Sequence, residues 1–192
     1  MKSAAFMSRL LMMGIVSSLL LTSCLLPGMI PLEGESTVPM PAMEKDGNAL
    51  IEALKARDLV YLQALAEEQY TEAEFARPGT LTFIATVTND KPTYFNYGWC
   101  TTTEEILQQN LEHIKIRFYF DGKELGKDVV HPITFTRSDG FVCVDFGVLI
   151  SDWSPGEYQL EAVVTFDEQI NDGAADFEAG DYIYEYNVTV SK

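Results

Sequence analysis

Residues 142–166 read VCVDFGVLISDWSPGEYQLEAVVTF, and this stretch decides the fold. Apolar side chains occupy every second position on both sides of Pro155-Gly156. They are Val142, Val144, Phe146, Val148 and Ile150 before it, and Tyr158, Leu160, Ala162, Val164 and Phe166 after it. Alternation with a period of two is typical of strands that bury one face. Because Pro-Gly favours a turn, the stretch predicts two strands separated by a turn.

The same alternation recurs in five further segments. They are residues 81–88, 94–99, 114–120, 133–136 and 182–190. Turn-forming dipeptides such as Asp121-Gly122 and Asp139-Gly140 punctuate the pattern. Only residues 102–109 interrupt it, and Thr102 followed by Glu105 predicts a short capped helix there. We therefore predict a mainly β fold, an antiparallel β-sandwich of about seven or eight strands over residues 78–192.

One motif carries a resemblance to a known class of domain. The segment Trp153-Ser154-Pro155-Gly156-Glu157-Tyr158-Gln159-Leu160 resembles the W-x-x-G-x-Y-x-L start of a late strand in bacterial immunoglobulin-like and fibronectin-like domains. The resemblance implies an immunoglobulin-like sandwich and no particular activity. Tyr97-Gly98-Trp99-Cys100 and the Asp172-Gly173 loop are similar to sequences in uncharacterised bacterial lipoproteins, which imply no activity either.

Residues 1–23 have the composition of an export signal peptide. Lys2 and Arg9 accompany an apolar run, Leu10 to Leu21, of a length usual for such signals. The next residues, up to Cys24, resemble the bacterial lipobox, which implies cleavage before Cys24 and lipidation of its thiol. An uncleaved membrane anchor and plain secretion are the alternatives. All three place the rest of the chain outside the cytoplasm.

Two segments separate the signal from the predicted sandwich. Residues 24–46 are rich in proline and predict a flexible, lipid-anchored tether. Residues 47–77 predict a helical spacer, because good helix formers dominate them. Asp58 interrupts the helical pattern, and because Asp is a good N-cap, two short helices and one bent helix are both open. Thr71 with Glu74 matches a capping box. The spacer loosely resembles the opening helices of the nuclear-transport-factor superfamily, but the strands that follow do not match that fold.

The charge balance of the chain limits the classes of partner that it can bind. The chain has 13 Lys and Arg against 29 Asp and Glu, a formal net charge of -16. A nucleic-acid partner is excluded, because neutralising phosphates requires a basic face. Adsorption to anionic lipid through a basic patch is disfavoured for the same reason. The membrane contact that we expect is the N-terminal lipid.

Cys100 and Cys143 remain once Cys24 is assigned to the lipid. An oxidising compartment favours their pairing. The alternation turns Trp99 inward and Cys100 outward, and it places Cys143 on the outer side of its strand. We therefore predict a disulfide on the outer face, between neighbouring strands or at a strand end. Such a bond differs from the one that crosses the core of antibody domains.

The segment from 167 to 181 offers candidate calcium ligands. Its oxygen-bearing residues are Asp167, Asn171, Asp172, Asp176, Glu178 and Asp181. Calcium is bound by six to eight such oxygens. The spacing does not match the helix-loop-helix calcium signature, so a solvated acidic loop is the alternative. No other cofactor is indicated.

An aromatic group at residues 94–99 has two interpretations. Tyr94, Phe95, Tyr97 and Trp99 have the composition of a sugar or peptide platform. The alternation instead turns the last three toward the core and leaves Tyr94 outside, so we predict core packing. We expect Trp153 to cap one end of the core. His113 and His131 flank different strands, and we predict surface positions for both.

The sequence contains no motif of a serine hydrolase, zinc protease, phosphate loop or dinucleotide-binding fold. We therefore predict a non-enzymatic module of the cell envelope that binds an unidentified protein or glycan partner. Two alternatives stay open. One is a calcium-stabilised form of the same module. The other is an accessory domain or subunit of an envelope hydrolase.

Overall fold

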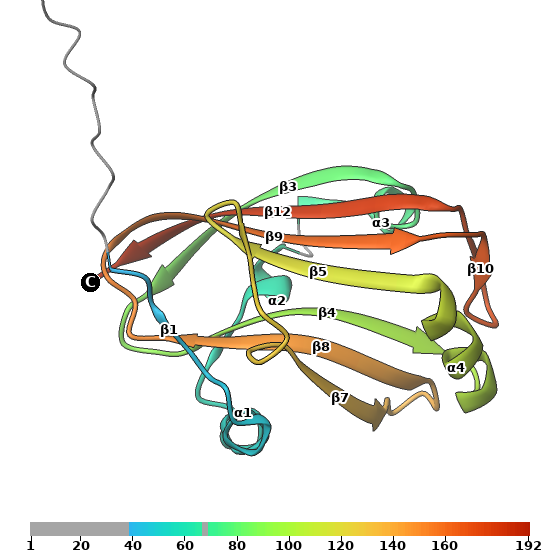
Figure 1. Cartoon of the computed structure of the whole chain (residues 1–192), viewed down its shortest axis with the longest axis horizontal. Coiled ribbons are helices and arrows are strands. Elements are labelled where there is room, and N and C mark those ends of the chain that lie inside the picture. Colours follow the sequence, from blue (N-terminus) through green and yellow to red (C-terminus); the bar gives the residue numbers. More distant parts are fainter. Residues whose placement is uncertain (1–38, 67–68) are drawn as a thin grey trace, which may run out of the picture. The chain divides into compact units, whose positions relative to one another are not determined.

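The computed structural model describes residues 39–66 and 69–192, which form a β-sandwich of two sheets (Figure 1). Sheet A contains β1 (Ala42–Met43), β2 (Val60–Tyr61), β4 (Thr93–Thr101), β7 (His131–Thr136) and β8 (Val142–Ser151). Sheet B contains β3 (Gly79–Thr88), β5 (Ile114–Phe120), β6 (Lys123–Glu124), β9 (Gly156–Phe166) and β12 (Gly180–Ser191). A separate ribbon pairs β10 (Ile170–Asn171) with β11 (Asp176–Phe177).

The predicted two-sheet sandwich is confirmed. Every alternating segment of the sequence forms one of the long strands, which are β3, β4, β5, β7, β8, β9 and β12. The turn at Pro155-Gly156 links β8 in sheet A to β9 in sheet B. The stretch 142–166 therefore spans both layers, and its alternating apolar side chains face the interior of the sandwich from both sides.

The strand directions correct one part of the prediction. β3 lies parallel to β12 from Gly79 opposite Tyr182 to Thr88 opposite Ser191, and β2 lies parallel to β4. The sandwich is therefore mixed rather than purely antiparallel. The period of two in a sequence shows which side chains share a face. It contains no information about the direction of the neighbouring strand.

A densely packed core fills one end of the space between the sheets. Phe83, Phe95 and Leu160 have no exposed surface there, and Tyr186 is nearly as buried. Trp153 closes this end with 3% of its surface exposed, as predicted.

Helix α1 (Gly47–Ala56) covers the outer face of sheet A (Figure 1). Leu50 of the helix packs with Tyr94 and Leu149 of the sheet, and all three are buried. Tyr94 lies on the outer face as predicted, but the expectation that it is exposed is wrong, because the helix covers it. Its ring occupies the space over Gly147, where a Cβ atom would overlap it.

The helical segment breaks at Asp58, where the sequence pattern is interrupted, but Asp58 does not have the predicted role. Asp58 lies in the connection after α1 and pairs with Lys91 at 2.8 Å, so it is not an N-cap. The short helix α2 (Leu62–Ala66) follows β2 directly, and α3 (Glu72–Phe75) begins at the predicted capping box of Thr71 and Glu74. These helices pack on the sandwich, with Leu62 in its core.

Two more boundaries differ from the prediction. Helix α4 (Glu104–His113) is capped by Thr103 rather than Thr102, because the Thr103 hydroxyl accepts from the Ile106 N–H at 3.3 Å. Ala42 and Met43 lie within the predicted tether but pair with Ser151 and Ile150 of β8. A strand of two residues shows no period, so the sequence pattern could not reveal it.

Two side chains cap the free edge of β3 next to α3. The Gln69 amide bonds to both the N–H and the carbonyl of Ile84, at 3.0 and 3.1 Å. The Tyr70 hydroxyl bonds in the same way to the N–H and the carbonyl of Thr82. These contacts satisfy edge groups that otherwise invite pairing with another chain. They also hold Tyr70 and α3 at the opening between the sheets.

Candidate functional site

A cavity of about 710 Å³ lies between the sheets, beside α2 and α3. This volume is within the range of about 300–1,000 Å³ that is usual for ligand pockets. Aromatic residues dominate the lining, and they are Tyr70, Phe75, Tyr97, Trp99, Phe166, Phe177, Tyr182, Tyr184 and Tyr186. The other lining residues are Gln63, Ala66, Glu72, Ala76, Asn96, Gly98, Arg137 and Ala175.

Strand alternation aims these rings into the cavity from both sheets. Tyr97 and Trp99 lie on the inner face of β4, and Tyr184 lies on the inner face of β12. The rings of Tyr97 and Tyr184 face one another across the sandwich, with centroids 5.7 Å apart. Trp99 makes edge contacts with Phe166 and Phe177, at 5.2 and 4.9 Å. The cavity thus has rigid aromatic walls.

Two buried polar atoms of lining residues have no hydrogen-bond partner among the residues that the structure describes. They are Nε1 of Trp99 and Oδ1 of Asn96. Trp99 has 6% of its surface exposed, so bulk water does not solvate its N–H freely. Buried polar groups are nearly always paired, and leaving one unpaired is costly. The two atoms lie on opposite faces of β4, because Asn96 shares the outer face with Tyr94 whereas Trp99 faces inward.

A hydrogen-bond network behind the cavity fixes the orientation of Asn96. Its Nδ2 donates to Asp145 Oδ1 at 2.8 Å and to Gln63 Oε1 at 3.0 Å. The Tyr94 hydroxyl donates to the other carboxylate oxygen of Asp145 at 2.9 Å. Burial raises the pKa of Asp145, while these two donors oppose the rise. Because the amide nitrogen must face the carboxylate, the amide oxygen is the atom left unpaired.

The titratable groups of the lining are mostly neutral. Burial raises the pKa of Tyr97 and of Tyr184, so both phenols stay protonated at physiological pH. Arg137 is held by two hydrogen bonds from Nε and one from Nη2 to the carboxylate of Asp139, and it stacks on the Phe141 ring at 4.8 Å. Glu72 is the one carboxylate of the described lining. The cavity is therefore suited to neutral hydrogen bonding and ring stacking.

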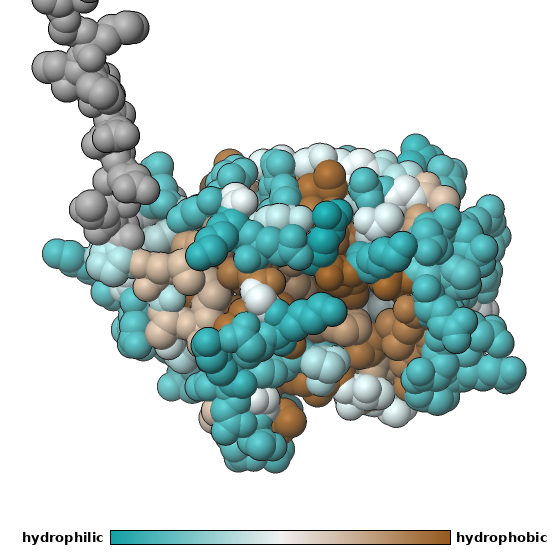
Figure 2. Space-filling model, viewed as in Figure 1, coloured by the Kyte–Doolittle hydropathy of each residue, from teal (hydrophilic) through white to brown (hydrophobic). Residues whose placement is uncertain are grey.

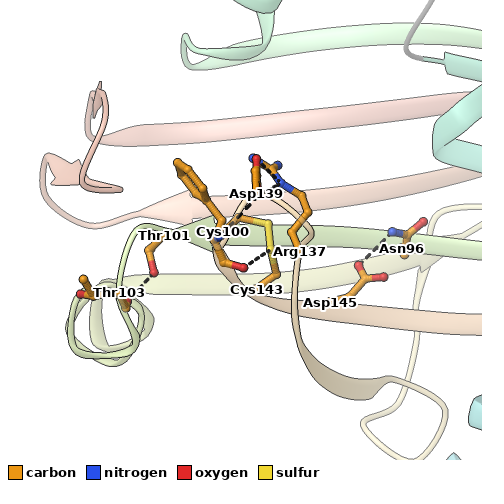
Figure 3. Close-up of a disulfide and its surroundings, with 9 residues drawn as sticks. Asn96, Cys100, Thr101, Thr103, Arg137, Asp139, Cys143 and Asp145 are labelled. Atoms are coloured by element: carbon orange, nitrogen blue, oxygen red, sulfur yellow. Dashed lines mark hydrogen bonds and ion pairs between the residues drawn. A yellow bond between two sulfur atoms is a disulfide. The ribbon is translucent and has the colours of Figure 1, made fainter.

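The predicted disulfide is present beside the cavity (Figure 3). Cys100 of β4 and Cys143 of β8 are directly opposite one another, on the outer face of sheet A. The bond therefore joins neighbouring strands, as predicted, and does not cross the core. The two cysteines are 43 residues apart, and closing a loop of that length stabilises a fold by about 3–4 kcal/mol.

The predicted calcium ligands are not brought together. Asp167 pairs with His113 at 2.9 Å, and Asp181 accepts from the Thr165 hydroxyl at 2.6 Å. Neither carboxylate lies in a common site with the other. Within residues 39–66 and 69–192, no group of three or more His, Cys, Asp or Glu residues could hold a metal ion.

The other four acidic-loop residues stabilise the loop itself. Asn171 donates to Asp176 at 2.7 Å, and Asp172 accepts from the backbone N–H groups of Ala174 and Ala175. The carbonyl of Glu178 accepts from the Tyr182 hydroxyl at 3.0 Å. The six residues are close in sequence, but their oxygens do not surround one common site. One reason is that turn side chains bond to the backbone of their own turn.

Several other predicted positions lie away from the cavity or outside the described residues. The His131 ring contacts the Glu44 carbonyl at 3.1 Å, and both histidines are outside the cavity lining. Cys24 and the predicted signal peptide lie outside the described residues. Among the helices in the described part of the chain, none is long and apolar enough to span a membrane.

Sequence reasoning assigned Tyr97 and Trp99 to the core, and it did not single out Tyr182 and Tyr184. Phe95 and Trp99 are both buried members of core clusters, as predicted, and Tyr97 packs against both clusters. Tyr97 and Trp99 also line the cavity. The residue types of β12 contain a signal that could have indicated the cavity. Inward positions of β12 carry tyrosines where a closed core would carry aliphatic side chains, and a tyrosine hydroxyl requires a polar neighbour.

Comparisons with known proteins yield no family. No protein-family profile matches the chain, and no curated protein is significantly similar to it. The cysteine protease inhibitor EhICP2 from Entamoeba histolytica aligns over 59% of this chain and 99% of its own, with 9% identity and a TM-score of 0.32. The CFA/I adhesin CfaE from enterotoxigenic E. coli, as a single-residue mutant, aligns over 64% of this chain and 50% of its own, with 8% identity and a TM-score of 0.21. Both TM-scores are too low for either likeness to carry an argument.

Proposed function

We propose that this chain is a non-enzymatic binding module of the bacterial cell envelope, anchored outside the cytoplasm by a lipid on Cys24. Its binding site is the aromatic cavity between the two sheets. The observation that carries the proposal is a cavity of about 710 Å³ with a mainly aromatic lining, to which Trp99 contributes a buried Nε1 that has no hydrogen-bond partner among the described residues. A pocket with few convergent polar groups is the usual form of a small-molecule site.

The chemistry of the lining favours binding over catalysis. The described lining residues include one carboxylate, Glu72, and none of them is His, Cys, Lys or Ser. The raised pKa of Tyr97 and of Tyr184 keeps both phenols protonated at physiological pH, so neither is available as a general base. General acid-base or nucleophilic catalysis requires a matched pair of such groups within hydrogen-bond reach.

The location outside the cytoplasm has two supports. The Cys100–Cys143 disulfide fits an oxidising compartment, since such bonds are rare in the cytosol. The lipobox resemblance ending at Cys24 is independent of that bond.

The strand order supports the immunoglobulin-like part of the proposal. Sheet A contains the neighbours β4, β8 and β7, and sheet B contains β5, β9 and β12. When the seven long strands are lettered A to G along the chain, β4, β8 and β7 become strands B, E and D. The strands β5, β9 and β12 become C, F and G of the facing sheet, as in immunoglobulin-like domains. The disulfide is a departure, because it joins β4 to β8 within one sheet.

A cavity-blocking variant tests the binding function. Ala175 lines the cavity from the exposed β10–β11 loop, whereas the neighbouring Ala174 does not line it. We expect Ala175→Trp to abolish the stabilisation that small molecules from a fragment library give in thermal melting. Ala174→Trp, the matched control, should retain it. If no compound stabilises the wild type, or if both variants respond equally, the cavity is not the binding site.

A further inference from the structure

We propose that the partner at the cavity is an extended polypeptide segment, neutral or basic, that adds a strand to the free edge of β4. The backbone of the segment would pair with β4, and its alternate side chains would enter the aromatic cavity. The inference rests on the proposed binding function and names the class of partner. The position of the cavity, the direction of the backbone groups of β4 and the charge of the chain lead to it.

The cavity runs along one edge of β4. Four consecutive residues of this strand, from Asn96 to Trp99, line it. Successive side chains of a strand point to opposite faces of its sheet. A space that all four residues line therefore follows the edge of the strand and is not confined to the inner face. An added strand would lie in this position.

The cavity edge of β4 has a neighbouring strand only at its start. β8 pairs with the other edge over the whole strand, from Thr93 to Thr101. On the cavity side β2 pairs with Thr93 and Tyr94, and in the described part of the chain no strand lies beside the rest of β4. Immunoglobulin-like sheets place strand A on this edge of strand B. Here the first long strand, β3, pairs with β12 of the facing sheet, so it leaves that position open.

The backbone groups of Asn96 and Gly98 point to this open edge. The Pro92 carbonyl accepts from the N–H of Val60 in β2 at 2.9 Å, and the Thr102 N–H donates to a carbonyl of the β10–β11 turn at 2.8 Å. Backbone groups alternate in direction along a strand, so Asn96 and Gly98 direct their N–H and C=O groups to the same side as Pro92. Among the described residues, neither has a backbone hydrogen-bond partner on that side, and Gly98 is exposed. These are the groups that an added strand would pair with.

The free edge of β3, beside α3, is closed in contrast. The Gln69 amide and the Tyr70 hydroxyl bond to the backbone groups of Ile84 and Thr82 there. A free edge is a template for pairing with another chain. The fold therefore blocks the edge of β3 with side chains and leaves the cavity edge of β4 available.

The charge of the chain selects the occupant. Its net charge is -16, so two copies of the chain repel one another. Glu72 is the one carboxylate of the described lining, and the guanidinium of Arg137 is already bonded to Asp139. A neutral or basic segment therefore matches the site better than a second copy or an acidic segment. Apolar or aromatic side chains at alternate positions match the aromatic lining.

The test measures peptide binding by the full-length chain in phosphatidylcholine nanodiscs, followed by titration calorimetry. The probes are acetylated peptides of about nine residues that alternate threonine with Val, Leu, Phe or Tyr between terminal lysines. We expect saturable binding of at least one peptide, and weaker binding of its version with terminal glutamates. N-methylation of alternate backbone nitrogens removes the donors from one side of a peptide. Methylation of the side that faces β4 should abolish binding, and methylation of the other side should leave it unchanged. Equal affinity of the two methylated forms would overturn the inference.

Two substitutions of Gly98 form a matched pair. Gly98→Pro and Gly98→Ala both add a Cβ atom, which would lie 3.3 Å from Asp145 Oδ1, but only proline removes the N–H that faces the open edge. Proline is tolerated on an edge strand where its nitrogen faces away from the ladder. We expect Gly98→Pro to bind the peptide roughly three- to tenfold more weakly than Gly98→Ala. Equal affinities would overturn the inference.

The remaining outcomes separate this inference from the proposed binding function. Small molecules that stabilise the wild type but not Ala175→Trp, without binding of any peptide, would overturn the inference and leave the binding function standing. Binding of neither probe class would overturn both. Self-association of the chain that Gly98→Pro abolishes would assign the edge to a second copy and would overturn the partner named here.

Discussion

The two tryptophans of the sandwich, Trp99 in β4 and Trp153 in the connection between β8 and β9, have different surroundings. Trp153 packs against Phe120 and Tyr158, and its Nε1 donates to the buried Thr93 hydroxyl at 3.1 Å. Trp99 contacts Phe166 and Phe177, and its Nε1 has no partner among the described residues. Both are buried, with 3% and 6% exposed. The two side chains are therefore similar in burial and differ in the completion of their hydrogen bonds.

The two regions are also stabilised differently. Around Trp153, packing of aromatic and aliphatic side chains is continuous, and that region contains most of the main core cluster. Trp99 belongs to a second, smaller core cluster and also lines the cavity. The Cys100–Cys143 bond ties β4 to β8 covalently beside it. Figure 2 shows apolar residues gathered in the middle of the visible face, where the two sheets of Figure 1 face one another, with hydrophilic residues over much of the rest.

The largest effect that we expect comes from truncating the packed tryptophan. Trp153→Ala should lower the free energy of unfolding by about 3–5 kcal/mol, because it leaves a cavity in a filled core. Trp99→Ala should cost clearly less, since it enlarges a space that already exists. Urea denaturation of both variants measures the difference. Equal losses would show that the two regions are equally packed and would break the comparison.

Removing the disulfide should have the next largest effect. The double variant Cys100→Ala with Cys143→Ala should lose about 3–4 kcal/mol, because the unfolded chain regains the freedom of a loop of 43 residues. Denaturation of the oxidised wild type, the reduced wild type and the variant provides the measurement. Reduction should reproduce the loss in the wild type and have no effect on the variant. A variant as stable as the oxidised wild type would contradict a stabilising role for the bond.

A finer contrast comes from replacing each tryptophan with phenylalanine. Trp153→Phe removes the donor from the fully buried Thr93 hydroxyl and should cost about 1–3 kcal/mol. Trp99→Phe removes an N–H that has no partner, so it should leave stability nearly unchanged. The two variants lose the same atoms, which makes them matched. A larger loss for Trp99→Phe would mean that its N–H is already satisfied.

The smallest effect that we expect is a change in the pH dependence of stability, and its source is the buried carboxyl of Asp145. Burial raises the pKa of Asp145 in the folded chain, so the folded state binds this proton more tightly than the unfolded state does. The wild type therefore loses stability from this group as the pH rises from about 4 through the folded pKa. Asp145→Asn does not titrate, so its stability relative to the wild type should increase across that window and then level off. Unfolding at about pH 3 and about pH 7 checks the sign.

Asp139 supplies the control of opposite sign. Its hydrogen bonds with Arg137 lower its pKa, so its ionised form stabilises the fold once the pH exceeds the unfolded value. Asp139→Asn should therefore lose stability relative to the wild type as the pH rises. If Asp145→Asn shifts in the same direction as Asp139→Asn, burial does not dominate the pKa of Asp145.

Much of the fold was predictable from residues alone. The alternation in 142–166 and its five companions indicated strands and their inward faces, because one buried face imposes a period of two. The outer-face position of Cys100 and Cys143 followed from the same rule, since Trp99 beside Cys100 faces inward. The capping box at Thr71 was predictable as well, because its hydrogen bonds join residues three apart.

Other features depended on contacts between distant segments. Tyr94 is buried only because α1 covers that face of the sheet, and β3 lies parallel to β12. The calcium prediction placed six oxygen-bearing residues in one loop. In the folded loop Asn171 bonds to Asp176, whereas Asp167, Asp172 and Asp181 each bond to partners outside this set.

The sequence by itself determined the layers of this protein, the face of each strand and the outer position of its disulfide, because these depend on near neighbours along the chain. Tertiary structure alone decided the cavity. Tyr97 of β4 and Tyr184 of β12 meet across the sandwich, and no spacing in the sequence predicts that they do. A cavity forms where the side chains of several segments leave space unfilled, so its position is visible only in the packed structure.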